Sequence, residues 1–222
     1  MKVSKESMRL YAVTDRMWLG NKSFIDQVED SIKGGVTFVQ IREKMIPFDA
    51  YVTLGKEIKE VTDKYNVPLV MNDDVEVAIA CGADGVHVGQ QDMEASDVRV
   101  KIGKDMILGV SVQTVQQAIR AEEKGADYLG VGAVFSTSTK LDADAVNYET
   151  LKAICNAVSI PVVAIGGIAK ETIMKLKGSG IDGVAVVSAI FAQDDIYAAS
   201  RELRNLSDEM VKGWNKEANF VL

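Results

Sequence analysis

The sequence predicts a (β/α)8 (TIM) barrel built as a single domain over residues 1–222, and three observations carry this prediction. Short runs rich in Val, Ile and Leu alternate with longer stretches whose apolar residues recur at helical spacing. There are eight such runs, the number of strands in this kind of barrel. A glycine also precedes every second run, which indicates a repeated unit of two strands.

The predicted strands are near-continuous apolar runs, as is typical of parallel strands that are buried on both faces. In chain order they span residues 9–15, 36–43, 67–73, 84–90, 106–112, 127–135, 160–167 and 182–190. Parallel neighbours need a long crossover, and the stretches between the runs have the length and pattern of amphipathic helices. One apolar stripe in residues 23–35 is formed by Phe24, Ile25, Val28 and Ile32. Another, in residues 114–126, is formed by Val115, Ala118 and Ile119.

The recurring glycine stands in KGGVTF, CGADGVHV, KGADYLGV and SGIDGVAV, before the second, fourth, sixth and eighth strands. Glycine tolerates the left-handed backbone that ends a helix, so we expect helix C-terminal caps at these positions. The recurrence favours two-unit modules within one closed sheet. An open doubly wound sheet has the same alternation and is the alternative fold. The chain ends in an extended helical tail from about residue 194, in which we expect Trp214 and Phe220 to pack against the same chain rather than a second copy.

The composition excludes several classes of protein. The net charge of −7 and a pI near 4.9 argue against general binding to nucleic acid. Cys81 and Cys155 are too few for a disulfide framework, which fits a reducing compartment. The sequence has neither a signal-peptide pattern nor an 18-residue apolar run, so we expect a cytoplasmic protein that does not insert into membranes. Whether it forms a homo-oligomer stays open.

Polar side chains follow nearly every predicted strand, at the barrel end where active sites form. In VQIREK, alternation sends Gln40, Arg42 and Lys44 to the same side of an extended chain. Two cations there favour a polyanion, and a guanidinium beside an ammonium suits a diphosphate better than a carboxylate. A solvated strand end is the alternative interpretation.

Asp73 and Asp92 follow adjacent predicted strands. Two carboxylates beside a bound diphosphate repel it unless a divalent cation intervenes, so the pair indicates a Mg²⁺ site that is complete only with substrate. Helix capping is the alternative, in which Asp73 or Asp74 caps the next helix and Asp92 begins another. We expect one aspartate of NDD to be a cap.

Gly166 and Gly167, together with Val187 and Ser188, follow the seventh and eighth strands, where many barrels bind a phosphate through backbone N–H groups. This indicates a second anion site. His87 is the only histidine and lies within a strand, so we interpret it as structural rather than as a catalytic base. Without a second histidine or a placed cysteine, chemistry driven by electrostatics and leaving-group ionisation is favoured over a nucleophilic triad.

The motifs taken together resemble the thiamine-phosphate synthase (thiamine-phosphate pyrophosphorylase) family over residues 10–191. They are YAVTD, VQIREK, NDD, GVHVGQQDM, GVSV, GADYLGVGAVFSTSTK, AIGGI and GVAVVSAIF, in that order. The resemblance implies a Mg²⁺-dependent transferase acting on small phosphorylated substrates. It would condense 4-amino-2-methyl-5-(diphosphooxymethyl)pyrimidine with 4-methyl-5-(2-phosphooxyethyl)thiazole, giving thiamine phosphate and pyrophosphate by dissociative substitution.

The resemblance also implies roles for individual residues. The pyrimidine diphosphate would be bound by Gln40, Arg42, Glu43, Lys44, Asn72, Ser111 and Lys140. Of these, the catalytic residues would be Arg42, Lys44, Ser111 and Lys140. The thiazole phosphate would be bound by Thr137, Ser138, Thr139, Gly167, Val187 and Ser188. Asp73 and Asp92 would hold Mg²⁺.

Two positions depart from the family pattern. The chain has GAVFSTSTK, with Ala133, Ser136 and Ser138, where the family usually has prolines in this loop. Gln113 stands where many relatives have histidine. The related thiazole tautomerases use a histidine there for proton transfer, which weakens a tautomerase function for this chain. A tautomerase-like enzyme and a non-catalytic thiazole-phosphate-binding barrel are the alternatives. A phosphosugar isomerase or aldolase is a further alternative, but it requires a catalytic base or a Schiff-base lysine inside a strand, and the predicted strands contain no evident candidate.

Overall fold

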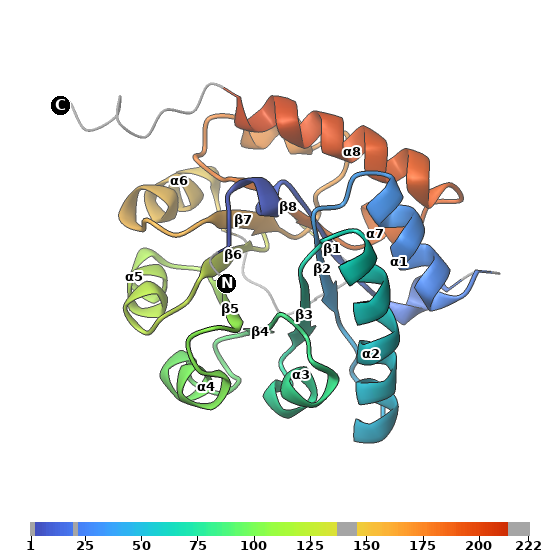
Figure 1. The fold of residues 1–222 in the computed structure, drawn as a ribbon. Coiled ribbons are helices and arrows are strands. Elements are labelled where there is room, and N and C mark those ends of the chain that lie inside the picture. Colours follow the sequence, from blue (N-terminus) through green and yellow to red (C-terminus); the bar gives the residue numbers. More distant parts are fainter. Residues whose placement is uncertain (1–2, 20–21, 137–145, 213–222) are drawn as a thin grey trace.

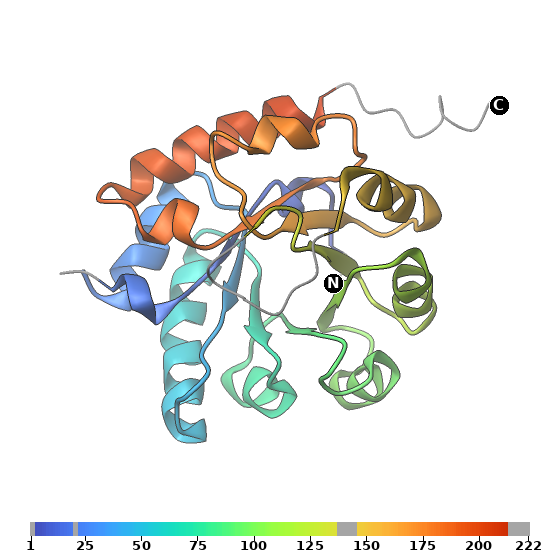
Figure 2. The same cartoon turned by 180° about the vertical axis from the view of Figure 1, so that it is seen from behind.

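The computed structural model describes residues 3–19, 22–136 and 146–212 and has a closed barrel at its centre. Eight parallel strands follow one another around the barrel in chain order, and β8 pairs with β1 to close it. The predicted barrel is therefore confirmed, and the open sheet is excluded. Figures 1 and 2 show the barrel from its two ends, with helices around the outside.

Most strands are four residues long, so the buried part of each predicted run is shorter than the apolar stretch. The strands are β1 Leu10–Val13, β2 Phe38–Ile41, β3 Leu69–Asn72, β4 Gly85–Val88, β5 Ile107–Val112, β6 Tyr128–Gly132, β7 Val162–Ile165 and β8 Gly183–Val186. The helices are α1 Phe24–Lys33, α2 Phe48–Lys64, α3 Val75–Cys81, α4 Ala95–Ile102, α5 Val115–Glu123, α6 Tyr148–Ala157, α7 Ser188–Phe191 and α8 Ile196–Val211. Three 3-10 turns are η1 Glu6–Met8, η2 Arg16–Trp18 and η3 Ile173–Leu176.

Alternation along the strands divides the core into two clusters. Outward-facing side chains pack under the helices in the larger cluster. The smaller cluster fills the barrel interior and includes Tyr11, Phe38 and Tyr128, with Met8 of η1 packed against it. The N-terminal segment therefore covers the end of the barrel at which the strands begin, as Figure 1 shows. The opposite end is left for the loops that follow the strands.

Three of the four predicted caps are confirmed, because Gly35, Gly82 and Gly125 stand at the ends of α1, α3 and α5 and have positive φ angles. Gly180 also has a positive φ, but it lies four residues beyond the end of η3, whose C-cap is Lys177, so the prediction of a helix cap there was wrong. Two residues after each glycine, a side chain accepts a hydrogen bond from a backbone N–H at the start of the preceding strand. These four acceptors, which we call the strand-start clamps, are Thr37 to Leu10 at 2.9 Å, Asp84 to Leu69 at 2.8 Å, Asp127 to Leu108 at 2.8 Å and Asp182 to Val162 at 3.0 Å. Each clamp therefore ties the segment before the second strand of a two-strand module to the start of the first strand.

The helices begin at the side-chain caps that polar residues provide. Ser23 caps α1, and Thr114 with Gln117 forms a capping box at α5. The predicted stripe of α1 packs against the core, but Ile119 of α5 is exposed, contrary to the sequence prediction. Ala118 and Ala121 form the buried face, and Ile119 lies about 100° around the helix from Ala118.

The seventh crossover and the C-terminal helix differ from regular barrel units. The turn η3 takes the place of a full helix between β7 and β8. Helix α8 packs on α1 and η3 and spans the seam where β8 meets β1, as seen in Figure 1. Trp214 and Phe220 lie outside the described residues.

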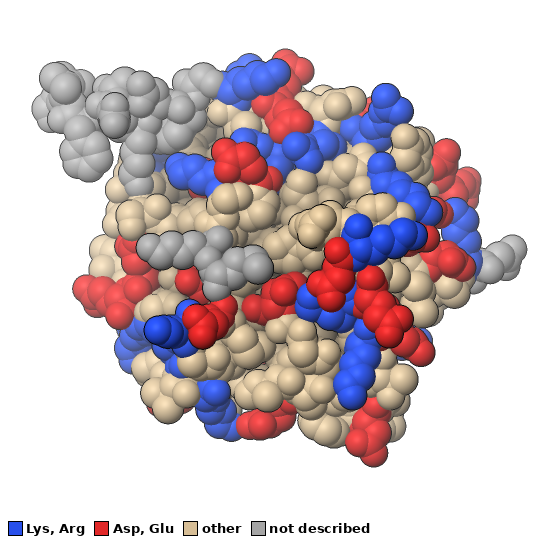
Figure 3. Space-filling view, viewed as in Figure 1, with Lys and Arg blue, Asp and Glu red and all other residues tan. Residues whose placement is uncertain are grey.

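Basic and acidic side chains are intermixed over the face of the molecule seen in Figure 3, in keeping with the many surface ion pairs.

Candidate active site

The predicted site residues that the structure describes lie at or beyond the carboxyl ends of the strands. Gln40 is on β2, with Arg42, Glu43 and Lys44 directly after it. Asn72 ends β3, Asp73 follows it, and Asp92 lies in the loop after β4. Ser111 is on β5, Gly167 follows β7, Val187 follows β8, and Ser188 begins α7. Thr137, Ser138, Thr139 and Lys140 lie outside the described residues.

Asp73 is the centre of the best-defined part of this region. Its backbone has a φ of 64°, an uncommon left-handed conformation for a residue other than glycine. Burial raises the pKa of its carboxyl to about 6, and the neighbouring Asp92 carboxyl adds to the rise through a hydrogen bond and its charge. The Asn72 side chain and the Arg42 charge act in the opposite direction. Side chains from three different strand ends therefore act on the Asp73 carboxyl, Asp92 and Asn72 through hydrogen bonds and Arg42 through its charge.

The capping alternatives are resolved by the neighbouring hydrogen bonds. Asp74 is the N-cap of α3, and its carboxylate accepts from the Val77 N–H at 2.9 Å. The N-cap of α4 is Glu94 rather than Asp92. The Asp92 carboxylate instead accepts from the Gly89 N–H at 2.7 Å. The cap in NDD is thus Asp74, which leaves the carboxylates of Asp73 and Asp92 facing each other.

The segment after β2 is held by the loop after β1, which the sequence interpretation missed. Thr14 Oγ accepts from the Arg42 N–H at 3.1 Å, and Asp15 lies 3.7 Å from the Arg42 guanidinium. Arg16 Nε contacts both carboxylate oxygens of Glu43 at 2.9 Å. Glu43 is thereby engaged with a protein cation, whereas Lys44 is exposed. The available signal was Thr-Asp-Arg directly after the first buried strand.

Gln40 and Ser111 face the barrel interior from β2 and β5, and His87 lies between Ser111 and Tyr128. The His87 ring nitrogens both have hydrogen-bond partners, Nδ1 with Tyr128 Oη at 2.9 Å and Nε2 with Ser111 Oγ at 2.9 Å. Only 8% of His87 is exposed. His87 is thus held by Tyr128 on one side and contacts the predicted site residue Ser111 on the other.

The ends of β7 and β8 form the other side of the mouth. Gly166 and Gly167 have φ angles of 100° and 63° and pass close to the segment that follows β6. A Cβ on Gly167 would lie 2.4 Å from the Ser136 carbonyl oxygen, so no larger residue fits without displacement. Close packing against the β6 loop thus gives the glycine pair a structural role in addition to the predicted anion site.

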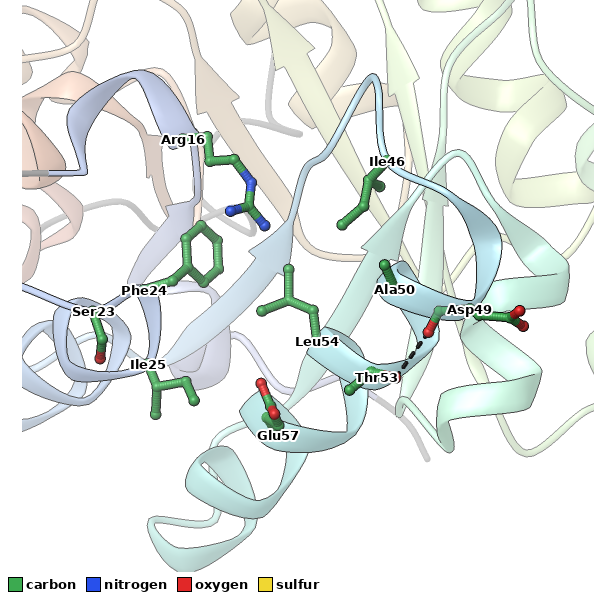
Figure 4. Close-up of a pocket in the computed structure, with 10 residues that line it drawn as sticks. All are labelled: Arg16, Ser23, Phe24, Ile25, Ile46, Asp49, Ala50, Thr53, Leu54 and Glu57. Atoms are coloured by element: carbon green, nitrogen blue, oxygen red, sulfur yellow. Dashed lines mark hydrogen bonds between the residues drawn. The ribbon is translucent and has the colours of Figure 1, made fainter.

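A surface groove of about 640 Å³ lies between α1 and α2, outside the barrel. Figure 4 shows Phe24 and Leu54 between the two helices, with Arg16 and Ile46 above them in this view. None of the described residues that line it is a predicted site residue, although Arg16 at its edge also contacts Glu43 in the loop after β2.

Comparison with known proteins decides the family. The family model described as thiamine monophosphate synthase matches residues 10–190, most of the chain. The chain belongs to the thiamine monophosphate synthase family. A relative from Ruminiclostridium cellulolyticum, named thiamine-phosphate synthase, is 52% identical over 90% of this chain and 95% of its own length. A thiamine-phosphate synthase from Clostridium tetani is 48% identical over 90% of this chain and 96% of its own.

Solved structures agree with this membership. The thiamine phosphate pyrophosphorylase from Pyrococcus furiosus superposes with a TM-score of 0.86 at 38% identity, covering 93% of this chain and 98% of that one. A 3-hexulose-6-phosphate synthase superposes with a TM-score of 0.66 at 18% identity, which shows a shared fold only. The family and the transferase class predicted from the synthase resemblance are confirmed.

The carboxylate pair fits the divalent cation that the synthase resemblance implies. Asp73 and Asp92 face each other, and this proximity contributes to the raised pKa of Asp73. Across the described residues, no group of three or more His, Cys, Asp or Glu side chains could hold a metal. Mg²⁺ characteristically binds through one or two carboxylates plus substrate phosphates, so a two-carboxylate site is sufficient.

No helix in the described part of the chain is long and apolar enough to cross a membrane.

Proposed function

We propose that this chain is a cytoplasmic, single-domain thiamine-phosphate synthase that joins the aminopyrimidine diphosphate to the thiazole phosphate and releases pyrophosphate. The influence of Asp92, Asn72 and Arg42 on the Asp73 carboxyl at the barrel mouth carries the proposal. Two carboxylates, an amide and a guanidinium from three strand ends match a diphosphate bound with a divalent cation. The residues that would hold Mg²⁺ are Asp73 and Asp92.

On the pyrimidine side, this chain's own residues bind and neutralise the diphosphate. Arg42 is fixed through its backbone by Thr14 and lies beside Asp15, so its guanidinium is oriented before substrate arrives. Lys44, Ser111 and Lys140 complete the proposed set around the leaving group, with Gln40 and Asn72 beside the pyrimidine diphosphate. Bound Mg²⁺ supplies Lewis-acid neutralisation of the developing diphosphate charge. Glu43 acts through its contact with Arg16, as a support for this loop.

On the thiazole side, the proposed phosphate ligands are Gly167, Val187 and Ser188 with Thr137, Ser138 and Thr139. The positive φ of Gly167 and its close approach to the β6 segment support a backbone anion site at this edge of the mouth. The departure of pyrophosphate would leave a pyrimidine cation that the thiazole nitrogen captures, so no protein nucleophile is required.

The direct test supplies both substrates and Mg²⁺ to the purified full chain and measures thiamine phosphate and pyrophosphate. Asp73→Asn should lower turnover on the order of 100-fold or more, because it removes one of the two carboxylates proposed for the cation. Asp74→Asn is the matched control, since asparagine also caps helices and should leave turnover unchanged. Absence of product at high wild-type concentration would reject the synthase.

Two alternatives give different results in the same preparation. A non-catalytic barrel would bind the thiazole phosphate alone in calorimetry, whereas the synthase also binds the pyrimidine diphosphate in a Mg²⁺-dependent manner. A tautomerase would convert a thiazole tautomer without any pyrimidine. Gln113 cannot readily shuttle a proton, so we expect no such conversion.

A further inference from the structure

A chain of hydrogen-bonded side chains crosses the interior of the barrel below the mouth. It begins at Gln40 on β2, whose Nε2 donates to Tyr11 Oη on β1. Tyr11 Oη lies 2.8 Å from Tyr128 Oη on β6, and Tyr128 Oη lies 2.9 Å from His87 Nδ1 on β4. His87 Nε2 lies 2.9 Å from Ser111 Oγ on β5. Both ends of the chain are residues of the proposed pyrimidine diphosphate site.

One order of donors, running from Gln40 to Ser111, satisfies every contact along this chain. The Gln40 amide nitrogen only donates, so Tyr11 Oη accepts there, and in this order its own hydrogen goes to Tyr128 Oη. Tyr128 then donates to His87 Nδ1. A neutral imidazole that accepts at Nδ1 carries its hydrogen on Nε2, so His87 donates to Ser111 Oγ. Ser111 Oγ therefore accepts from below, and its own hydrogen is left for an acceptor in the mouth.

The barrel interior is shaped around this chain. A Cβ on Gly109 of β5 would lie 2.3 Å from Tyr128 Oη and 2.5 Å from His87 Nδ1, and one on Gly130 would lie 3.2 Å from His87 Cε1. The two tyrosine rings also pack edge to face, with their centroids 5.8 Å apart. Tyr11 and Tyr128 are at most 1% exposed, so water does not compete for their hydroxyl groups.

We propose that Tyr11, Tyr128 and His87 are positioning residues that fix the Ser111 hydroxyl as a hydrogen-bond donor toward an oxygen of the departing diphosphate. This inference rests on the proposed function for the identity of the acceptor. The chain lets Ser111 stabilise charge as it develops, because the hydroxyl is oriented before the reaction and needs no reorganisation. His87 acts as a neutral link in this arrangement and transfers no proton.

The tautomer of His87 tests the direction without any substrate. Because His87 is the only histidine, protein labelled with ¹⁵N-histidine gives signals from a single imidazole. We expect the neutral Nε2–H tautomer in wild type, with Nδ1 showing the shift of an acceptor nitrogen. Tyr128→Phe removes the donor to Nδ1 and should move the Nδ1 shift or mix the tautomers. A dominant Nδ1–H tautomer or an imidazolium in wild type would overturn the proposal.

Steady-state kinetics test whether the chain acts through Ser111. Tyr128→Phe should lower kcat roughly tenfold, with the KM for thiazole phosphate unchanged, because one oriented hydrogen bond is lost from the transition state. In a Ser111→Ala background the same change should have little further effect. Full, independent losses in the double variant would show that Tyr128 has only a structural role. Tyr65→Phe is the control, since its hydroxyl bonds Glu29 outside the barrel and should change neither kinetics nor tautomer.

The failure of this inference and the failure of the proposed function can be told apart. An active wild type with the Nδ1–H tautomer rejects the directed chain and leaves the synthase intact. An inactive wild type with the Nε2–H tautomer rejects the synthase and the diphosphate acceptor, while the direction of the chain stands.

Discussion

Asp73 and Asp92 impose an electrostatic penalty on the metal-free protein. The folded pKa of Asp73, about 6, lies above the usual carboxyl value near 4, so the folded state holds this proton more tightly than the unfolded chain does. The stabilisation that this proton provides is fully present below about pH 4 and is lost as the pH rises through about 6. At neutral pH the pair therefore favours unfolding unless a cation binds.

Asp92→Asn should reduce this pH dependence, since asparagine removes the repelling charge but keeps an oxygen for the Gly89 N–H. Measured by thermal unfolding without metal, the stability of wild type should fall between about pH 4 and about pH 6 more steeply than that of the variant. Mg²⁺ with pyrophosphate should raise the melting temperature of wild type only. Equal pH slopes in the two proteins would contradict the proposed coupling.

Glycine is required for different reasons inside the barrel strands and at the helix ends. Gly109 lies within β5, where a Cβ would meet Tyr128 and His87 atoms. Gly82 ends α3 with a φ of 71°, and a Cβ added there would have no other atom within 4 Å. The first position is restricted by contact and the second by backbone strain alone.

Alanine substitution should separate these two demands. Gly109→Ala should lower the free energy of unfolding by at least about 2 kcal/mol and also lower kcat, because overpacking displaces the Tyr128–His87 contact. Gly82→Ala should lower the free energy of unfolding by about 1 kcal/mol through the left-handed backbone, with kcat unchanged. Urea unfolding and steady-state kinetics on both variants check this contrast, and an unaltered kcat in Gly109→Ala would contradict it.

Across the whole molecule, the hydrogen bonds that stabilise the barrel and the residues proposed for the reaction lie at opposite ends of the barrel. The four strand-start clamps lie where the strands begin, whereas the proposed site residues follow the strand ends. Residues at the starting end of such barrels typically contribute to stability, and those at the other end to function.

Asp127 gives the clearest test of this division, because it accepts from the Leu108 N–H and also pairs with Arg99 at 2.7 Å. Asp127→Ala should lower the free energy of unfolding by about 2 kcal/mol, since a part-buried N–H loses its acceptor. The KM and kcat of the folded fraction should stay at wild-type values. Asp97→Ala, on the exposed side of α4, is the control and should change stability by no more than about 0.5 kcal/mol. A kinetic defect in Asp127→Ala would show that the two ends are coupled.

The barrel could be predicted from the sequence because its signals are local. Apolar runs and glycine caps are read within a few residues, and the eight strands and three of the four caps were found where expected. The contact between Tyr11 and Tyr128 joins residues 117 positions apart, so it exists only once the barrel closes. The support that Arg16 gives to Glu43 likewise links two loops. The sequence alone does not specify the backbone angles of the NDD motif, and these angles decide that Asp74 rather than Asp73 caps α3.

The hydrogen-bonded chain inside the barrel has a consequence for redesign. An apolar core tolerates exchanges between side chains of similar volume, so the outer cluster under the helices can be varied widely. A chain of oriented donors tolerates few, because each replacement must preserve both shape and donor order. New substrate preferences should therefore be sought in libraries of the mouth loops, with Tyr11, His87, Gly109 and Tyr128 held constant.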